Sequence, residues 1–145
     1  MLAPPAPDAR VPAPVIISAD PGIDDALAIL LALASPELDV RAICTCYGNT
    51  LSRNAFRNAV EITRRAGRRV LLGSGARRPL VRELVTAPET HGESGLGYAA
   101  LPDAGLVLDH HWTLDRLLER EPEPVTLVTL GPVTDLAVVL HQNAQ

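Results

Sequence analysis

Three aspartates crowd into six residues directly after an apolar run. The run Val15-Ile16-Ile17 leads through Ser18 to Asp20, and Asp24 and Asp25 follow shortly after. Carboxylates this close repel one another unless a cation or hydrogen bonds offset their charges. Hard oxygen ligands in that number suit Ca²⁺ or Mg²⁺. Alternatively, the three aspartates stabilise the N-terminus of the next helix, with Asp20 as its N-cap and the other two in its first turn. From the residues alone, both interpretations stay open.

Other polar residues further along the chain could also take part in binding or catalysis. Asn49 follows a second apolar run, where it is either a turn former or a site residue. His91 lies in a glycine-rich loop, where a histidine is either solvated or faces a ligand. His110 and His111 would diverge by about 100° on a helix, a poor geometry for joint metal ligation, so we expect both at the surface. The residues around Ser94 lack the second glycine position of a nucleophile elbow, which argues against acyl transfer.

The elements that would position these residues alternate between strand and helix. We expect strands over 15–17, 40–47, 70–72 and 125–130, and helices over 23–34, 52–66 and 112–120 and from 134 onward. This alternation implies a parallel sheet with right-handed crossovers. The predicted fold class is therefore α/β, a Rossmann-like open sheet flanked by helices. Ligands bind such sheets outside the carboxyl ends of the strands, where Asp20 and Asn49 fall.

Two segments stand out within this pattern. The helix over 23–34 is apolar almost all round, which predicts burial on every side. The stretch 74–108 is rich in Gly, Pro and Thr and shows no sustained periodicity. A loop of that length is usually functional or disordered, and we expect it to be the most mobile ordered region.

Composition narrows the classes of partner and location. The 145 residues are 47% hydrophobic and carry a net charge of −4, so we expect no nucleic-acid partner. The longest apolar run is far too short to span a bilayer, so we expect no membrane partner. Residues 1–14 are predicted to form a disordered Pro/Ala-rich lead-in, and 15–145 one domain. Cys44 and Cys46 are interpreted as small buried hydrophobes in a reducing compartment, which predicts a cytoplasmic location.

Four motifs, taken in order, resemble one enzyme family. The segment Ser18-Ala19-Asp20-Pro21-Gly22-Ile23-Asp24-Asp25-Ala26 resembles the N-terminal D-x-D-P-G-x-D-D-A signature of the inosine–uridine-type nucleoside hydrolases. Cys46-Tyr47-Gly48-Asn49-Thr50 looks like the end of that family's second strand, and His91-Gly92-Glu93-Ser94-Gly95 like its H-G-E-S-G loop. Residues 127–136 look like its L-G-P-L-T-N segment. The resemblance covers about residues 15–141.

The resemblance implies Ca²⁺-assisted hydrolysis of the N-glycosidic bond of a ribonucleoside, which gives ribose and a free base. Carried over to this sequence, Asp20 would bind the ion and act as the base toward a bound water. Asp25 would be a second metal ligand, and Leu130 would offer its backbone carbonyl to the ion. An oxocarbenium-like transition state is consistent with a carboxylate-rich pocket.

The resemblance also implies the residues that contact the substrate. Asp24 would accept a hydrogen bond from a ribose hydroxyl, Asn49 would contact the sugar site, and His91 would face the substrate. The partner is thus a small ribonucleoside, and a homo-oligomer is a further expectation. The sequence gives no base preference.

Two departures from the family's pattern support an alternative. Ser18 stands where the family has its first Asp, which removes one negative charge from the cluster. The family's chain also continues well past residue 145 and supplies further site residues there. The alternative is therefore a catalytically inactive, truncated fragment of such a hydrolase that binds or depends on a partner. A phosphatase with a D-x-D nucleophile is disfavoured, because Ser18 occupies the nucleophile's place.

Overall fold

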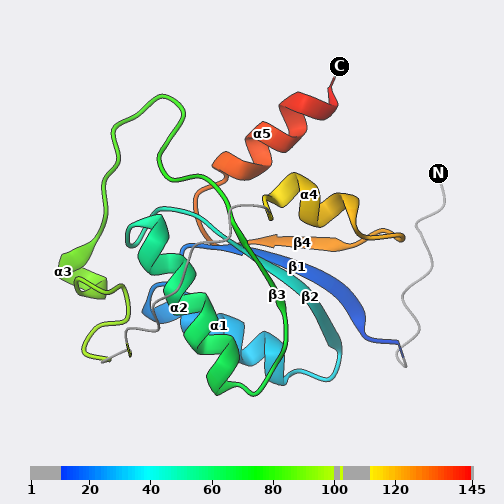
Figure 1. Ribbon diagram of the computed structural model, residues 1–145, viewed down its shortest axis with the longest axis horizontal. Coiled ribbons are helices and arrows are strands. Elements are labelled where there is room, and N and C mark those ends of the chain that lie inside the picture. Colours follow the sequence, from blue (N-terminus) through cyan, green and yellow to red (C-terminus); the bar gives the residue numbers. More distant parts are fainter. Residues whose placement is uncertain (1–10, 100–101, 103–111, 145) are drawn as a thin grey trace.

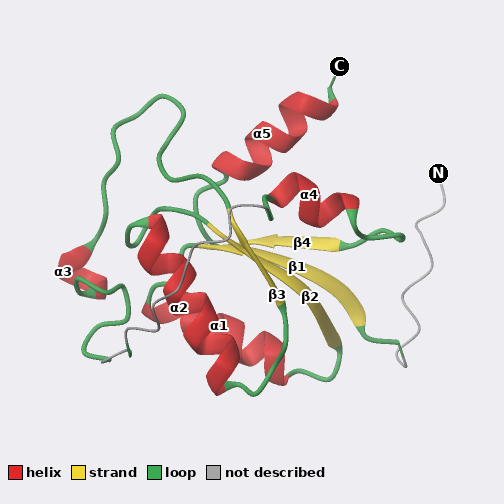
Figure 2. Cartoon of the chain, in the orientation of Figure 1, coloured by secondary structure: helices red, strands yellow, loops and turns green. Residues whose placement is uncertain are grey.

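Four parallel strands form one sheet in the order β3-β2-β1-β4. The computed structural model describes residues 11–99, 102 and 112–144. The strands are β1 (Ala13–Ala19), β2 (Leu38–Thr45), β3 (Leu71–Ser74) and β4 (Thr126–Thr129). Because β1 pairs with both β2 and β4, its carboxyl end lies between two neighbouring strand ends. Figure 2 shows the four strands as one twisted layer.

Helices cover both faces of this sheet (Figure 1). On one face, α1 (Ile23–Ala34) and α2 (Ser52–Arg65) bury Ile29, Leu33 and Ile62 against the sheet. On the other face, α4 (Leu114–Glu119) buries Leu114 and Leu117, and α5 (Thr134–Asn143) packs beside it. A further short helix, α3 (Pro88–His91), lies in the long connection after β3. The predicted α/β class with a parallel sheet flanked by helices is confirmed.

All of the predicted strands and helices are present, and most of them have shifted ends. The first strand begins at Ala13, so the last two residues of the predicted 1–14 lead-in belong to the sheet. The second strand spans Leu38–Thr45 rather than 40–47, because Cys46 and the following residues already form the turn at the site. Helix α2 ends at Arg65, one residue before the predicted end at 66, and Gly67 follows with a φ of +64°, a conformation that glycine adopts readily after a helix. Residues 1–10 of the lead-in lie outside the described residues.

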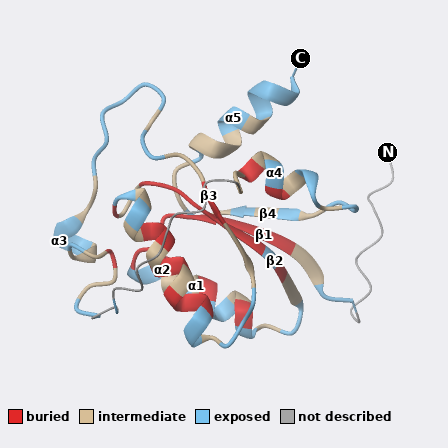
Figure 3. Cartoon of the chain, viewed as in Figure 1, coloured by how far each residue is buried: buried red, intermediate tan, exposed pale blue. Residues whose placement is uncertain are grey.

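Two predictions about α1 are wrong. The helix is not buried all round: Leu27 and Leu31 are 65% and 70% exposed, since the described residues pack against only one side of it (Figure 3). Asp20 is not its N-cap, because the helix begins at Ile23 and Gly22 precedes it. The carboxylate of Asp25 accepts the hydrogen bond from the Gly22 N–H instead, at 3.2 Å.

The remaining expectations concern the long loop and the cysteines. The described part of the 74–108 stretch contains α3 and is otherwise without helix or strand after Ser74. His110 and His111 lie outside the described residues, as do 100–101 and 103–108 of the loop. Cys44 and Cys46 are free and buried, as expected of small hydrophobes. Among the described residues, no helix combines the length and the apolar character needed to cross a membrane.

Candidate carboxylate site at the end of β1

Asp20 directly follows β1 and is only 4% exposed. One of its carboxylate oxygens, Oδ2, accepts a hydrogen bond from the backbone N–H of Asn49 at 2.6 Å. Glycines make this approach feasible: a Cβ at Gly48 would collide with Oδ2, and a Cβ at Gly131 would lie 2.5 Å from Oδ1. The loops after β2 and β4 therefore enclose the Asp20 carboxylate from both sides.

Asp25 lies in the first turn of α1 and is also 4% exposed. Its Oδ2 accepts hydrogen bonds from the Asn49 side-chain amide at 2.8 Å and from the Gly22 N–H. Its other oxygen, Oδ1, is buried and has no hydrogen-bond partner within the part of the chain that is described. Asn49 thus donates to both aspartates, through its backbone to Asp20 and through its side chain to Asp25.

Burial dominates the electrostatics of this pair. It raises the pKa of Asp20 from 3.8 to about 6, against the lowering effect of the Asn49 N–H, and the nearby Asp25 and Asp24 carboxylates raise it further. Burial also raises the pKa of Asp25, with the Gly22 N–H and the Asn49 amide acting in the opposite direction. Neutral donors alone therefore do not offset the cost of placing two negative charges here.

Asp24 and His91 lie beside this pair, at the first turn of α1. The Asp24 side chain is 82% exposed, whereas that of His91 is 12% exposed, and Asp24 Oδ1 lies 4.0 Å from His91 Nδ1. The same Nδ1 accepts a hydrogen bond from the backbone N–H of Ile23 at 3.2 Å. Gly22 lies between the site groups, since a Cβ there would be 2.6 Å from both the Asn49 amide and His91 Nδ1. His91 is therefore held against the first turn of α1 rather than solvated.

Leu130 directly follows β4 and lies beside Ser18, near the end of β1. The Leu130 N–H donates to the Ser18 carbonyl oxygen at 2.8 Å, which extends the pairing of β1 with β4 by one residue beyond β4. Ser18 is buried, at 3% exposed, two positions before Asp20 on the same strand. The chain therefore places Leu130 beside the last residues of β1, next to Gly131 and the Asp20 carboxylate.

The oxygen atoms of this site can be compared with the ligands that a cation requires. Among the described residues there is no group of three or more His, Cys, Asp or Glu side chains that could hold a metal ion. Two buried carboxylates remain, and Asp25 Oδ1 is an unpartnered hard oxygen of the kind Ca²⁺ prefers. Ca²⁺ takes about six to eight oxygen ligands, so this pair fits part of a calcium site and leaves most ligands to other oxygens.

Two asparagines of α2 that were not among the predicted site residues support the site. Asn54 donates to the Glu93 carbonyl oxygen at 3.1 Å, and Asn58 donates to those of Pro21 and Ser94, both at 2.9 Å. The available signal was the position of Asn58 among the apolar residues Ala55, Ala59 and Ile62, which share one side of the helix. A polar residue at a buried position needs hydrogen-bond partners.

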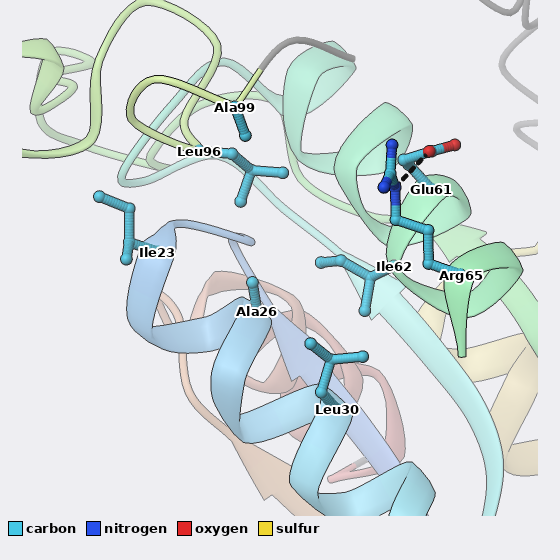
Figure 4. Close-up of a pocket in the computed structure, with 8 residues that line it drawn as sticks. All are labelled: Ile23, Ala26, Leu30, Glu61, Ile62, Arg65, Leu96 and Ala99. Atoms are coloured by element: carbon cyan, nitrogen blue, oxygen red, sulfur yellow. Dashed lines mark hydrogen bonds and ion pairs between the residues drawn. The ribbon is translucent and has the colours of Figure 1, made fainter. Parts of the chain in front are cut away.

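A hollow of about 450 Å³ lies between α1, α2 and the loop after α3 (Figure 4). Its walls are mainly apolar and include Ile23, Leu30, Ile62 and Leu96, with the Glu61–Arg65 ion pair at its rim. This hollow contains neither Asp20 nor Asp25 among its lining residues, so it is distinct from the carboxylate site.

Comparisons with known proteins identify relatives of this chain. The family model described as inosine-uridine preferring nucleoside hydrolase matches residues 15–145. The pyrimidine-specific ribonucleoside hydrolase RihA of Citrobacter koseri is 41% identical over 136 residues, which are 91% of this chain and 44% of that protein. RihA of Salmonella arizonae matches to the same extent.

Solved structures agree with this result. The plant nucleoside hydrolase PpNRh1 has a TM-score of 0.78 and 40% identity, over 91% of this chain and 43% of that one. A purine-preferring ribonucleoside hydrolase from Gardnerella vaginalis has a TM-score of 0.79 and 28% identity, over 89% and 43% of the two chains. This chain therefore spans less than half the length of the relatives that it matches.

Proposed function

Because the chain belongs to the inosine–uridine preferring nucleoside hydrolase family, we propose that it acts in hydrolysis of the N-glycosidic bond of a ribonucleoside. The products are ribose and a free base. The observation that carries this proposal is the Asp20–Asn49–Asp25 cluster at the carboxyl end of β1, in which both carboxylates are buried. It places two carboxylates where α/β sheets bind their ligands.

Asp20 is the proposed base. In this reaction a water oxygen bonds to the sugar C1′ as the bond from C1′ to the base nitrogen breaks, and the departing base takes up a proton. Asp20 accepts the proton of the attacking water, for which a carboxylate with a raised pKa is suited. The negative charge of Asp25 stabilises the positive charge that develops on the ribosyl group.

We propose Ca²⁺ as the cofactor of this site. Asp20, Asp25 through its unpartnered Oδ1, and the backbone carbonyl of Leu130 would hold it. When bound, such an ion lowers the pKa of a coordinated water and orients sugar hydroxyls. Burial is the main cause of the raised pKa of both carboxyl groups, and the positive charge of the ion would offset it together with the repulsion between the carboxylates.

The remaining site residues are proposed to contact the sugar. Asp24 is exposed in the first turn of α1 and offers a carboxylate to a ribose hydroxyl. Asn49 presents its amide beside the carboxylate pair, and His91 closes the other side of Gly22. The relatives carry names that specify pyrimidine, purine or inosine and guanosine, so ribose is the part of the substrate that we assign.

The chain's free, buried cysteines favour a reducing location for this reaction. Both thiols are uncharged at neutral pH, because burial raises the pKa of each well above its usual range. Disulfides are rare in the cytosol, where thiols stay reduced. We therefore propose the cytoplasm as the location.

A second candidate function is that of an inactive, partner-dependent fragment of such a hydrolase. The observation that favours it is the exposed apolar surface on α1 and beyond β4, where Leu27, Leu31 and Val133 are each more than half exposed. In addition, no residue of α5 is fully buried. Such a chain would bind another polypeptide through these surfaces and release no ribose by itself.

Measuring ribose release from the purified chain separates the two candidates. The assay would use a panel of purine and pyrimidine ribonucleosides, with Ca²⁺ or with a chelator. We expect Ca²⁺-dependent release that Asp20→Asn reduces by about 10³-fold, as for loss of a general base and metal ligand. The matched control Asp39→Asn changes a half-exposed carboxylate at the opposite end of the sheet and should keep the parent rate. Absence of release by the parent would favour the partner-dependent fragment.

A further inference from the structure

Asn58 is a polar side chain at a buried position of α2. It is fully buried, with 0% exposure, and lies on the inner face of the helix with Ala55, Ala59 and Ile62. Burying an amide without hydrogen bonds costs several kcal/mol in an apolar environment. The position is therefore costly unless the amide makes specific bonds.

Those bonds reach two separate segments around the candidate site. The Asn58 amide nitrogen donates to the Pro21 carbonyl oxygen, directly after Asp20, and to the Ser94 carbonyl oxygen in the loop after α3. Both distances are 2.9 Å. Two carbonyl acceptors fix the orientation of the amide, because the reverse orientation would bring its oxygen against two carbonyl oxygens.

The same two segments meet again on the other side of Gly22. Three residues before Ser94, His91 accepts the Ile23 N–H through Nδ1 at 3.2 Å. Ile23 in turn lies two residues after Pro21. A closed ring of contacts thus runs from Pro21 through Asn58, Ser94 and His91 to Ile23. The backbone between Ser94 and His91 is itself tied by the bond from the Gly95 N–H to the Gly92 carbonyl oxygen at 3.1 Å.

We propose that Asn58 is a positioning residue that holds the His91 loop against the turn carrying Asp20 and Asp25. Because Asn58 is hydrogen-bonded to both segments, loss of its two bonds lets the loop and the turn move relative to each other. His91 then no longer stays aligned with the first turn of α1. Through the Gly22 N–H, which donates to Asp25, the same turn also sets the position of that carboxylate. The chemical consequence of this role rests on the proposed hydrolase function, whereas the positioning itself can be measured without substrate or metal.

Asn54 provides a matched control on the same helix. It lies one turn before Asn58 and donates to the Glu93 carbonyl oxygen and to Thr50 Oγ1. It is thus bonded to the same loop, and neither of its two hydrogen bonds reaches the turn formed by residues 20–25. Removing its amide tests general loosening of the loop, while removing that of Asn58 tests the link between loop and turn.

The experiment compares Asn58→Leu and Asn54→Leu by NMR in the full chain, without nucleoside or Ca²⁺. Leucine is close to asparagine in size and lacks the amide donors. In Asn58→Leu we expect amide exchange at Ile23 to rise about tenfold relative to the amides of Ile17 and Ile43, as for loss of a buried hydrogen bond. The ¹⁵N shift of His91 Nδ1 should move toward that of a nitrogen without a hydrogen bond. Asn54→Leu should change the exchange rate at Ile23 by no more than about twofold and should leave the ¹⁵N shift of His91 Nδ1 at its parent value.

A variant in the loop keeps the test open if Asn58→Leu fails to fold. Gly95 has a φ of +89°, and a Cβ there would lie 2.9 Å from the Asn58 amide nitrogen, so Gly95→Ala displaces the loop from Asn58 without altering α2. We expect the same two changes at Ile23 and His91. The proposal is overturned if a folded Asn58→Leu or Gly95→Ala variant keeps both signals at parent values. Because neither signal depends on catalysis, absence of ribose release would contradict the proposed function and leave this result standing.

Discussion

At the scale of single residues, the site is organised around Asn49. One residue donates to both carboxylates, through its backbone to Asp20 and through its side chain to Asp25. These bonds hold the two acids in place, yet burial still raises the pKa of each. The pair is therefore fixed in position and short of positive charge, which is the condition that favours a bound cation.

The raised pKa of Asp20 predicts a pH dependence of stability. Asp20 binds protons more tightly in the folded chain than in the unfolded chain, so its stabilising contribution is complete below about pH 4 and is lost as the pH rises through about 6. In chelator, Asp20→Asn should remove that loss and gain about 1–3 kcal/mol over the parent at pH 8, relative to pH 4. Urea unfolding at several pH values measures this. The unfolding free energy of Asp39→Asn should vary with pH as that of the parent does. The same pH dependence for Asp20→Asn and the parent would show that the pKa of Asp20 is not raised in the folded chain.

A second prediction at this scale concerns Ser18. This buried residue lies two positions before Asp20, where the resembled signature has an Asp. Ser18→Asp adds a like charge, so the variant should melt at a lower temperature than the parent in chelator. It should then gain about 1 kcal/mol more than the parent when Ca²⁺ is added. Thermal unfolding with and without Ca²⁺ provides the test. An equal response of both proteins to Ca²⁺ would mean that residue 18 does not face the ion.

At the scale of elements, the sequence predicted where strands and helices lie along the chain better than it predicted which segments they contact. Hydrophobic runs located the strands, and strand ends located Asp20 and Asn49 on one edge of the sheet. The apolar pattern of α1 predicted burial on every side, but Leu27 and Leu31 are exposed, because a pattern shows that a surface can be buried and not what covers it. The bonds of Asn58 could not be predicted either, since they join segments more than 30 positions apart in the sequence.

The long connection after β3 should contain two regions of different mobility. Leu80, Val81 and Val85 are largely exposed, whereas the amides of His91 and Gly97 donate to backbone carbonyls at 2.9 and 2.7 Å. Hydrogen exchange should therefore be fast over 80–85, slower over 91–97, and slowest at Ile17 and Ile43 in the sheet. Strong protection over 80–85 would contradict our expectation that this loop contains the most mobile ordered region.

At the scale of the whole molecule, the described residues leave one side of the sheet partly uncovered. A groove of about 240 Å³ lies between α1 and β4, lined by Ala28, Ala32, Val128 and Leu130 among others. β4 is an edge strand of the sheet, and Leu130 after it is 44% exposed. Apolar surface beside an unpaired strand edge favours association with another chain.

We therefore predict that the isolated chain self-associates through this side. Sedimentation velocity should show an apparent mass that rises with protein concentration. Leu31→Glu places a charge on the exposed side of α1 and should shift the chain toward monomer, with about a tenfold weaker association. Val81→Glu is the matched control, because Val81 is 95% exposed in the long loop and belongs to neither α1 nor β4. A parent that stays monomeric at all concentrations would contradict self-association.

The most direct test of the central claim, that Asp20 and Asp25 form a cation-binding pair at the end of β1, is a calorimetric titration of the chain with Ca²⁺. The parent should bind the ion weakly, since Ser18 leaves the cluster one charge poorer than the family signature. Asp25→Ala removes the buried, unpartnered Oδ1 and should abolish binding, while Asp39→Ala at the far end of the sheet should bind as the parent does. Equal binding by the parent and Asp25→Ala, or none by the parent, would contradict the claim.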